Sequence, residues 1–214
     1  MSKRFILILV AIVLLFVGLS MTSKKKATAP TNSTSNSDQP TNHITGEGKK
    51  NVTLIEYGDY QCPACGAYYP LVKRLVEKYK SDIFFQFRNF PLSSIHPNAF
   101  AGARAAEAAG KQNKYWEMHD KLYEEQKTWS AANNSKSYFE QYAQALGLDV
   151  NKFLTDFSSD ETNNGINADI TAANKIGATS TPTFVLDGRK IDENPRDEES
   201  FIKLIEDAIA AKNK

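Results

Sequence analysis

Cysteine and histidine are scarce in this sequence. The 214 residues contain only two cysteines, Cys62 and Cys65, and three histidines scattered along the chain. A structural zinc site needs a second ligand pair, and no second pair exists. A disulfide across so short a loop adds little stability and cannot join distant elements. Both structural uses of the pair are therefore disfavoured, and we expect neither a metal nor another cofactor.

An excess of positive charge is also missing from most of the chain. Residues 51–214 carry nineteen Lys and Arg against twenty-three Asp and Glu, whereas residues 1–50 carry seven against two. Without a basic face the larger part has no electrostatic footprint for nucleic acid. With 41% hydrophobic and 24% charged residues, the chain has a globular composition. Residues 51–214 have the length of one ordinary domain, so a second catalytic domain is excluded.

Charge is absent altogether from Phe5 to Ser23. As a helix, these nineteen residues would be about 28 Å long, close to the roughly 30 Å of a bilayer's hydrocarbon core. We predict that residues 1–23 are a membrane anchor. A cleaved signal peptide is the alternative, but its only small-residue site, Ala27-Thr28-Ala29, is followed unfavourably by Pro30. Positive residues flank both sides, so they do not settle the orientation.

Apolar side chains are almost missing from residues 24–50, which are rich in Ser, Thr, Asn, Lys and Pro. Such a segment cannot bury enough surface to offset the entropy lost on ordering. We predict a flexible linker here, leading to a domain at residues 51–214. We expect this domain outside the cytoplasm, held by a single-pass anchor in the cell membrane, or secreted if the signal is cleaved.

The domain begins with a β-α-β pattern. Val52–Tyr57 is a short apolar, β-branched run typical of a buried strand, and residues 62–80 have the apolar spacing of a helix. Residues 83–88 are aromatic on both faces, which favours an interior strand. Pro70 lies within the helical run and should kink that helix. The pattern therefore predicts an α/β fold class.

Helical patterns then fill residues 97–177, including an alanine-rich run at 99–109. We expect Ser137 and Glu140 to form a capping box at one helix start, and Asp149 to cap the next helix. The chain closes on a β-β-α pattern. Its parts are a strand at 183–186, a hairpin turn at Asp187-Gly188, a strand at 189–191 and a helix from about Glu198.

The two cysteines lie as Cys62-Pro63-Ala64-Cys65 between the first strand and the first helix. Residues three apart on a helical turn have Cβ atoms about 5–6 Å apart, close enough for a disulfide. Backbone N–H groups and the positive end of the helix dipole should stabilise a thiolate at Cys62. We expect Cys62 to be the nucleophile, and the deeper Cys65 to be the thiol that resolves a mixed disulfide.

Together with Pro70 and Thr181-Pro182-Thr183, this motif resembles the thioredoxin superfamily. The stretches at 87–92, 96–99 and 115–120, with the helical insertion, are similar to its DsbA-like branch, over residues 45–211. The fold implied is a thioredoxin fold with a helical insertion at about 97–177. The implied activity is that of an extracytoplasmic thiol:disulfide oxidoreductase acting on reduced secreted proteins or peptides. A quinone-linked membrane partner would reoxidise it.

The resemblance also implies roles for residues around the pair. Pro182 would be cis and would pack beside the cysteines, although base rates for X-Pro bonds alone favour trans. Thr181 would offer backbone groups to the substrate, and Pro63 and Ala64 would also contact it. Glu56 would lie under the pair and assist proton transfer to Cys65, unless it is only a carboxylate at the rim of the sheet.

Packing in the core can explain several other side chains. His96 and His119 occur in segments that match the family, but their surroundings favour packing roles. The tyrosines near the motif could line a peptide groove or belong to the core; they are Tyr57, Tyr60 and Tyr68.

Ala64 departs from the family pattern, because the best-known oxidants carry histidine at this position. Alanine gives the Cys62 thiolate neither a hydrogen bond nor a positive charge, which favours a milder oxidant. A reductase or isomerase is therefore the alternative on the same fold. A redox-inert peptide-binding module or holdase is the alternative from another class.

Overall fold

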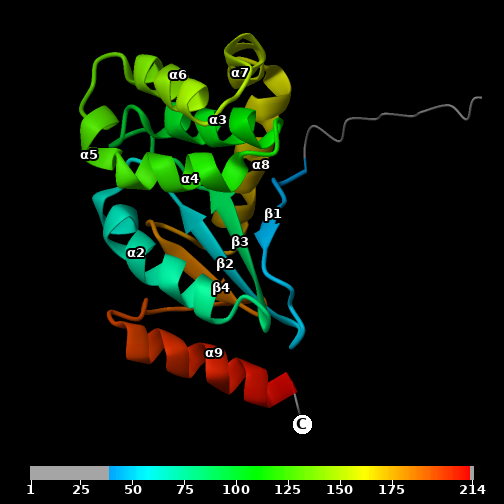
Figure 1. Ribbon diagram of the computed structural model, residues 1–214. Coiled ribbons are helices and arrows are strands. Elements are labelled where there is room, and N and C mark those ends of the chain that lie inside the picture. The colour runs from blue at the N-terminus through cyan, green and yellow to red at the C-terminus, as the bar shows by residue number, and fades with distance from the viewer. Residues whose placement is uncertain (1–38, 213–214) are drawn as a thin grey trace, which may run out of the picture. The chain divides into compact units, whose positions relative to one another are not determined.

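A mixed β-sheet lies at the centre of the molecule (Figure 1). The computed structural model describes residues 39–212, in which the strands are ordered β1-β3-β2-β4-β5. The predicted α/β class, opening with β-α-β and closing with β-β-α, is confirmed. The elements of these two units are β2 (Val52–Gly58), α2 (Pro63–Lys78), β3 (Ile83–Asn89), β4 (Thr183–Leu186), β5 (Arg189–Lys190) and α9 (Glu198–Lys212).

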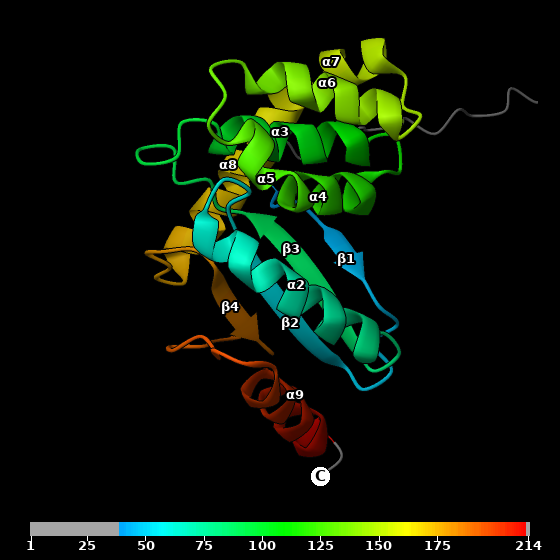
Figure 2. The same ribbon diagram turned by 60° about the vertical axis from the view of Figure 1, so that its left-hand side comes forward.

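The predicted insertion is a group of helices between β3 and β4. Figures 1 and 2 show these helices gathered at the end of the sheet where the parallel strands β2 and β3 finish. Helix α2 starts at the same end, so the insertion lies next to its first turn. The helices are α3 (Ala99–Gly110), α4 (Tyr115–Glu124), α5 (Gln126–Trp129), α6 (Ser135–Ala145), α7 (Val150–Phe157) and α8 (Asp160–Lys175).

The two faces of β2 contact different helices, because alternate residues of a strand point to opposite faces. Leu54 belongs to the main core with side chains of α2 and α9, including Leu75 and Phe201. Tyr57 instead packs in a smaller cluster with Ala173 of α8. The even-numbered residues of β2 therefore face α2, and Glu56 is one of them.

Strand β1 (His43–Thr45) lies inside the segment predicted to be a flexible linker. It pairs antiparallel with β3, and the backbone and side chain of Thr41 donate to Asp169 at 2.9 and 2.6 Å. The linker prediction is therefore wrong for this part, because paired backbone groups and a buried carboxylate hold it. Residues 24–38 of the predicted linker and the predicted membrane segment, residues 1–23, lie outside the described residues. Between residues 39 and 212, no helix has the length and apolar character needed to cross a membrane.

Most predicted helix signals are confirmed. The side chain of Asp149 accepts a hydrogen bond from the Lys152 N–H at the start of α7. Asp187 and Gly188 have φ of 48° and 79°, as the tight turn between β4 and β5 requires. Helix α2 continues through Pro70 to Lys78.

The predicted capping box is wrong. Helix α6 begins at Ser135, so Ser137 lies within its first turn and donates to the Asn134 carbonyl oxygen at 2.9 Å. Packing explains the earlier start, because Ser135 is buried and donates to Asn98 at 3.1 Å.

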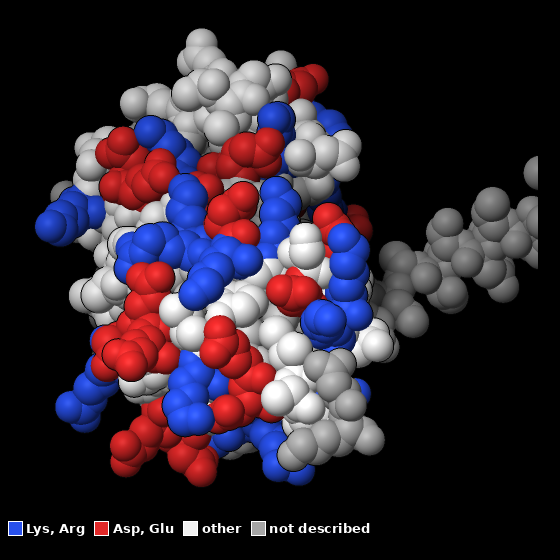
Figure 3. Space-filling view, turned by 60° about the horizontal axis from the view of Figure 1, so that its bottom comes forward, with Lys and Arg blue, Asp and Glu red and all other residues white. Residues whose placement is uncertain are grey.

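Charges of both signs are interspersed on the face shown in Figure 3. Ion pairs join some of these elements; Arg74 of α2, for example, lies 2.9 Å from Glu198 of α9. Such exposed pairs contribute little to stability. Their mixture agrees with the small net charge of the sequence.

Candidate functional site

The cysteine pair begins helix α2. Cys62 is the N-cap residue and Pro63 is the first helical residue, a position that tolerates proline because its N–H has no helical partner. Both sulfurs are free thiols in this structure. Cys62 is 7% exposed and Cys65 is fully buried at 0%, so the predicted order of depth is confirmed.

The surroundings of Cys62 stabilise its thiolate. The pKa of its thiol falls to about 5, first because the Cys65 side chain hydrogen-bonds to it. The Thr181 side chain and the backbone N–H groups of Cys65 and Ala64 lower this pKa further, against the opposing effect of burial. The predicted thiolate is therefore present at neutral pH. Its largest support is the partner thiol, with the helix start contributing less than the sequence suggested.

Cys65 shows the opposite behaviour. Burial raises the pKa of its thiol well above the ordinary value, and the hydrogen bond to Cys62 and nearby Glu56 raise it further. The backbone N–H of Asp59 points at its sulfur, 3.5 Å away. Cys65 is therefore a protonated thiol at neutral pH and needs a base before it can attack a disulfide.

Glu56 lies in the central strand β2 beneath the pair, between Phe87 of β3 and Phe184 of β4. It is 3% exposed, so the alternative of a carboxylate at the sheet rim is wrong. Burial, followed by the charge at Cys62, raises its pKa to about 8. Glu56 is therefore mostly protonated at neutral pH and close enough to influence Cys65.

The loop before β4 lies against Cys62. The Thr181–Pro182 peptide bond is cis, as the family resemblance implied and contrary to the base rate. The Cys62 sulfur lies 3.5 Å from the Thr181 carbonyl oxygen, to which it donates when it is protonated, and Asn194 donates to the Pro182 carbonyl oxygen at 2.7 Å. The structure thus brings Thr181 and Pro182 together with the cysteines.

Pro63 and Ala64 are exposed beside the pair, so both are accessible to a partner. Two of the three nearby tyrosines, Tyr57 and Tyr60, are buried, so the groove interpretation is wrong for them. Tyr68 is half-buried and packs against Phe184 and Phe201, so its place in a peptide groove stays a prediction.

Asp59 was not singled out in the sequence, although it connects the loops around the pair. Its side chain accepts from the Gln61 N–H at 2.7 Å and the Leu92 N–H at 2.9 Å. His96 lies 2.7 Å away through Nδ1, which agrees with a structural role for this histidine. The sequence alone did not mark Asp59, because two of its three partners, Leu92 and His96, lie more than thirty residues away.

Gln126 was also missed. Its side chain donates to the carbonyl oxygens of Tyr60 and Cys62 at 2.8 and 2.9 Å, and so attaches α5 to the start of α2. A Cβ on Gly66 would clash with this glutamine, which explains why glycine stands there.

Comparison with known proteins gives a consistent result. The sequence profile of the family described as Thioredoxin matches residues 38–207. Oxidised BdbD of Bacillus subtilis superposes with a TM-score of 0.70 at 22% identity, covering 80% of this chain and 96% of BdbD. DsbA2 of Pseudomonas aeruginosa superposes with a TM-score of 0.61 at 27% identity, covering 78% of this chain and 94% of DsbA2.

Among curated proteins, the Na(+)/H(+) antiporter NhaA 3 of Salinispora tropica is 35% identical over 153 residues, which are 72% of this chain. The match covers 22% of that antiporter, so this chain corresponds to a minor part of its length.

Proposed function

Because the chain belongs to the thioredoxin family and has the fold of its DsbA-like oxidoreductases, we propose that it donates a Cys62–Cys65 disulfide to reduced secreted proteins. The observation that carries this proposal is the opposite shift of the two thiol pKa values. A stabilised thiolate at Cys62 favours the reduced form of the pair, so the disulfide readily accepts electrons.

The exchange proceeds through two displacements. A substrate thiolate attacks the Cys62 sulfur, the Cys62–Cys65 bond breaks, and Cys65 leaves with the electron pair. Glu56 then gives its proton to the Cys65 thiolate. A second substrate thiolate attacks the substrate sulfur of the mixed disulfide and releases Cys62 as a thiolate. The substrate loses two electrons, which the cysteine pair gains.

The location and the reoxidising partner are parts of the same proposal. An uncharged segment at Phe5–Ser23 supports tethering to the cell membrane, with residues 51–214 outside the cytoplasm. A disulfide donor works in an oxidising compartment, where reduced secreted chains emerge. The reduced pair must then pass two electrons to an oxidant, and we propose a quinone-linked membrane protein for this step.

A reductase or isomerase is the second candidate, and Ala64 is the observation that favours it. Its methyl side chain gives no hydrogen bond to Cys62. Ala64 lowers the Cys62 pKa only through its backbone N–H. Thiolate stabilisation here depends mainly on Cys65, which limits how oxidising the disulfide can become.

The reduction potential separates these two candidates. When the full chain is equilibrated with glutathione buffers, its reduction potential should lie nearer to about −120 mV than to about −270 mV. Ala64→His should raise the potential, because a histidine would add a donor to the thiolate. A wild-type value near about −270 mV would support the reductase.

Replacing Pro182 with alanine should slow the release of mixed disulfides. Pro182 has no N–H, and it follows the Thr181 carbonyl that lies against Cys62, so alanine would add a backbone donor that can hydrogen-bond to the bound peptide and hold it on the enzyme. The measurement is the lifetime of a trapped enzyme–peptide disulfide by mass spectrometry. Pro97→Ala, at the start of the helical insertion, is the control, and equal lifetimes in all three proteins would remove Pro182 from the site.

A further inference from the structure

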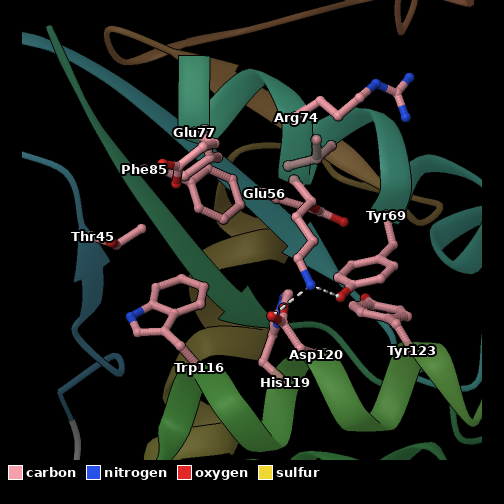
Figure 4. Close-up of a pocket in the computed structure, with 13 residues that line it drawn as sticks. Thr45, Glu56, Tyr69, Arg74, Glu77, Phe85, Trp116, His119, Asp120 and Tyr123 are labelled. Carbon is pink, nitrogen blue, oxygen red and sulfur yellow. Dashed lines mark hydrogen bonds and ion pairs between the residues drawn. The ribbon is translucent and has the colours of Figure 1, made fainter. Parts of the chain in front are cut away.

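A pocket of about 490 Å³ lies between α2 and α4 on the same side of the sheet as Glu56 (Figure 4). Trp116 and Phe85 form apolar walls, and Lys73 and Arg74 lie at its rim. These two cations have side chains 48% and 58% exposed, so the pocket reaches the protein surface. The pocket therefore connects solvent with the region beneath the cysteines.

Four buried polar side chains line this pocket: Glu56, Tyr69, His119 and Tyr123. Their exposed fractions are 3%, 8%, 6% and 6%. Within residues 39–212, neither the His119 Nε2 nor the Tyr123 hydroxyl has a hydrogen-bond partner. Buried polar atoms are nearly always hydrogen-bonded, so two such atoms beside a buried carboxyl group call for an explanation.

His119 is held on the same face of the sheet as Glu56. Its ring packs edge-on against Phe87 with the ring centroids 4.9 Å apart, and Phe87 is the direct neighbour of Glu56 across β2 and β3. Its Nδ1 lies 3.3 Å from the Asp120 carboxylate, which favours the tautomer with the proton on Nδ1. The lone pair is then on Nε2, the unpartnered atom.

Titratable groups surround His119 from several elements. Burial has the largest effect on the pKa of His119 and lowers it. Lys73 and His43 lower this pKa further, whereas Asp120 raises it. His119 is therefore neutral at pH 7 and able to accept a proton. The tyrosines packed around its ring are Tyr60, Tyr69, Tyr115 and Tyr123.

Cys65 can exchange its proton with solvent only if a path of polar groups connects the two. Cys65 is fully buried and Glu56 is its nearby carboxyl group, but Glu56 is itself buried and protonated at neutral pH. Glu56 must lose its proton before it can accept one from Cys65, and it must regain one after giving it away. The pocket is where Glu56 meets a path to solvent.

We propose that His119 relays protons between Glu56 and the solvent-connected pocket, with the Tyr123 hydroxyl as a second polar group along the path. This inference rests on the proposed function. His119 acts through Glu56 and does not touch the sulfur atoms, so it is a positioning residue for the proton that Cys65 exchanges.

The relay is needed when the pair is oxidised. With glutathione disulfide as the oxidant, the Cys62 thiolate forms a mixed disulfide and one glutathione thiolate leaves. Both groups line the solvent-connected pocket, and water in it carries the Glu56 proton to the unpartnered Nε2 of His119, which releases one to solvent. The Glu56 carboxylate then takes the Cys65 proton, and the Cys65 sulfur attacks Cys62 and displaces the second glutathione thiolate. Two electrons pass from the pair to glutathione disulfide.

The test is to follow both steps in the reduced full chain by acid quench and mass spectrometry. His119→Phe preserves the aromatic packing but removes both ring nitrogens. It should leave formation of the Cys62–glutathione disulfide within about twofold, and slow its resolution by Cys65 about tenfold or more at pH 7. Above pH 8 the slowing should shrink, because Glu56 is then already a carboxylate and can accept the Cys65 proton directly.

Two further comparisons distinguish a relay from a packing role. Glu56→Gln should slow resolution by itself, and adding His119→Phe to it should cause no further loss, because the relay acts through Glu56. Tyr123→Phe should slow resolution, whereas Tyr142→Phe, which removes an unpartnered buried hydroxyl away from the pocket, should not.

The outcomes separate this inference from the proposed function. If the wild type forms no mixed disulfide, the proposed function fails. If the mixed disulfide forms, but His119→Phe slows both steps equally, slows resolution equally at all pH values or adds its full effect to Glu56→Gln, only the relay is overturned.

Discussion

Replacing Cys62 with serine is expected to abolish disulfide transfer to a reduced test protein. A serine hydroxyl cannot form a disulfide, and it replaces the one thiol whose pKa lies near 5. The measurement is oxidative refolding of a reduced protein that requires disulfides. An absorbance titration at 240 nm should show a thiolate step near pH 5 in the wild type and no such step in Cys62→Ser.

Variants at Cys65 serve as matched controls. Cys65→Ser should still react at position 62 but should accumulate the mixed disulfide, because the resolving thiol is missing. Cys65→Ala should move the Cys62 titration above pH 5, since it removes the hydrogen bond that lowers this pKa most. Full function of Cys62→Ser in cells would contradict the oxidoreductase and support the redox-inert binding module or holdase.

Glu56→Gln is expected to stabilise the oxidised protein. The carboxyl group has a pKa near 4.5 when unfolded, and burial, the larger of the two causes and the one that remains when the disulfide removes the Cys62 charge, raises this pKa in the folded protein. Between the two pKa values the unfolded chain has released a proton that the folded chain still holds, so stability of the wild type falls as pH rises from about 4.5 through the folded pKa and levels off above that. Glutamine lacks this titration, so the variant's advantage should grow across the same range, to an order of a few kcal/mol.

The measurement is urea unfolding of both proteins in the oxidised state at several pH values, because the Cys62 thiol would otherwise titrate with the opposite sign. Asp169→Asn is the contrasting control. Asp169 is also buried, but it accepts hydrogen bonds from Thr41 and from the Asn89 N–H at 3.0 Å. Its amide variant should lose stability, because it presents a donor where these donors point. A pH-independent advantage for Glu56→Gln would show that Glu56 is not the group responsible.

The sequence by itself determined the elements whose causes are local. Periodicity predicted β2, α2 and β3 to within two residues, and Asp187-Gly188 identified its turn, because few residues adopt positive φ easily. The Cys62 thiolate was also predictable from the local sequence, because its largest support, the Cys65 thiol, lies three residues along the same helix and the helix start adds backbone N–H groups. Recognition of the family supplied the cis peptide bond at Pro182, which residue statistics alone did not.

Tertiary structure alone decided what depends on distant partners. Strand β1 looked like linker because its three residues gain stability only from pairing with β3. Ser137 resembled a cap in the sequence, but the helix begins two residues earlier, at Ser135, because Ser135 is buried. Asp59 and His119 gain their positions beside the cysteines and Glu56 from loops and helices far along the chain. Burial by such segments sets the pKa of Glu56 and Cys65, and no single stretch of sequence encodes burial.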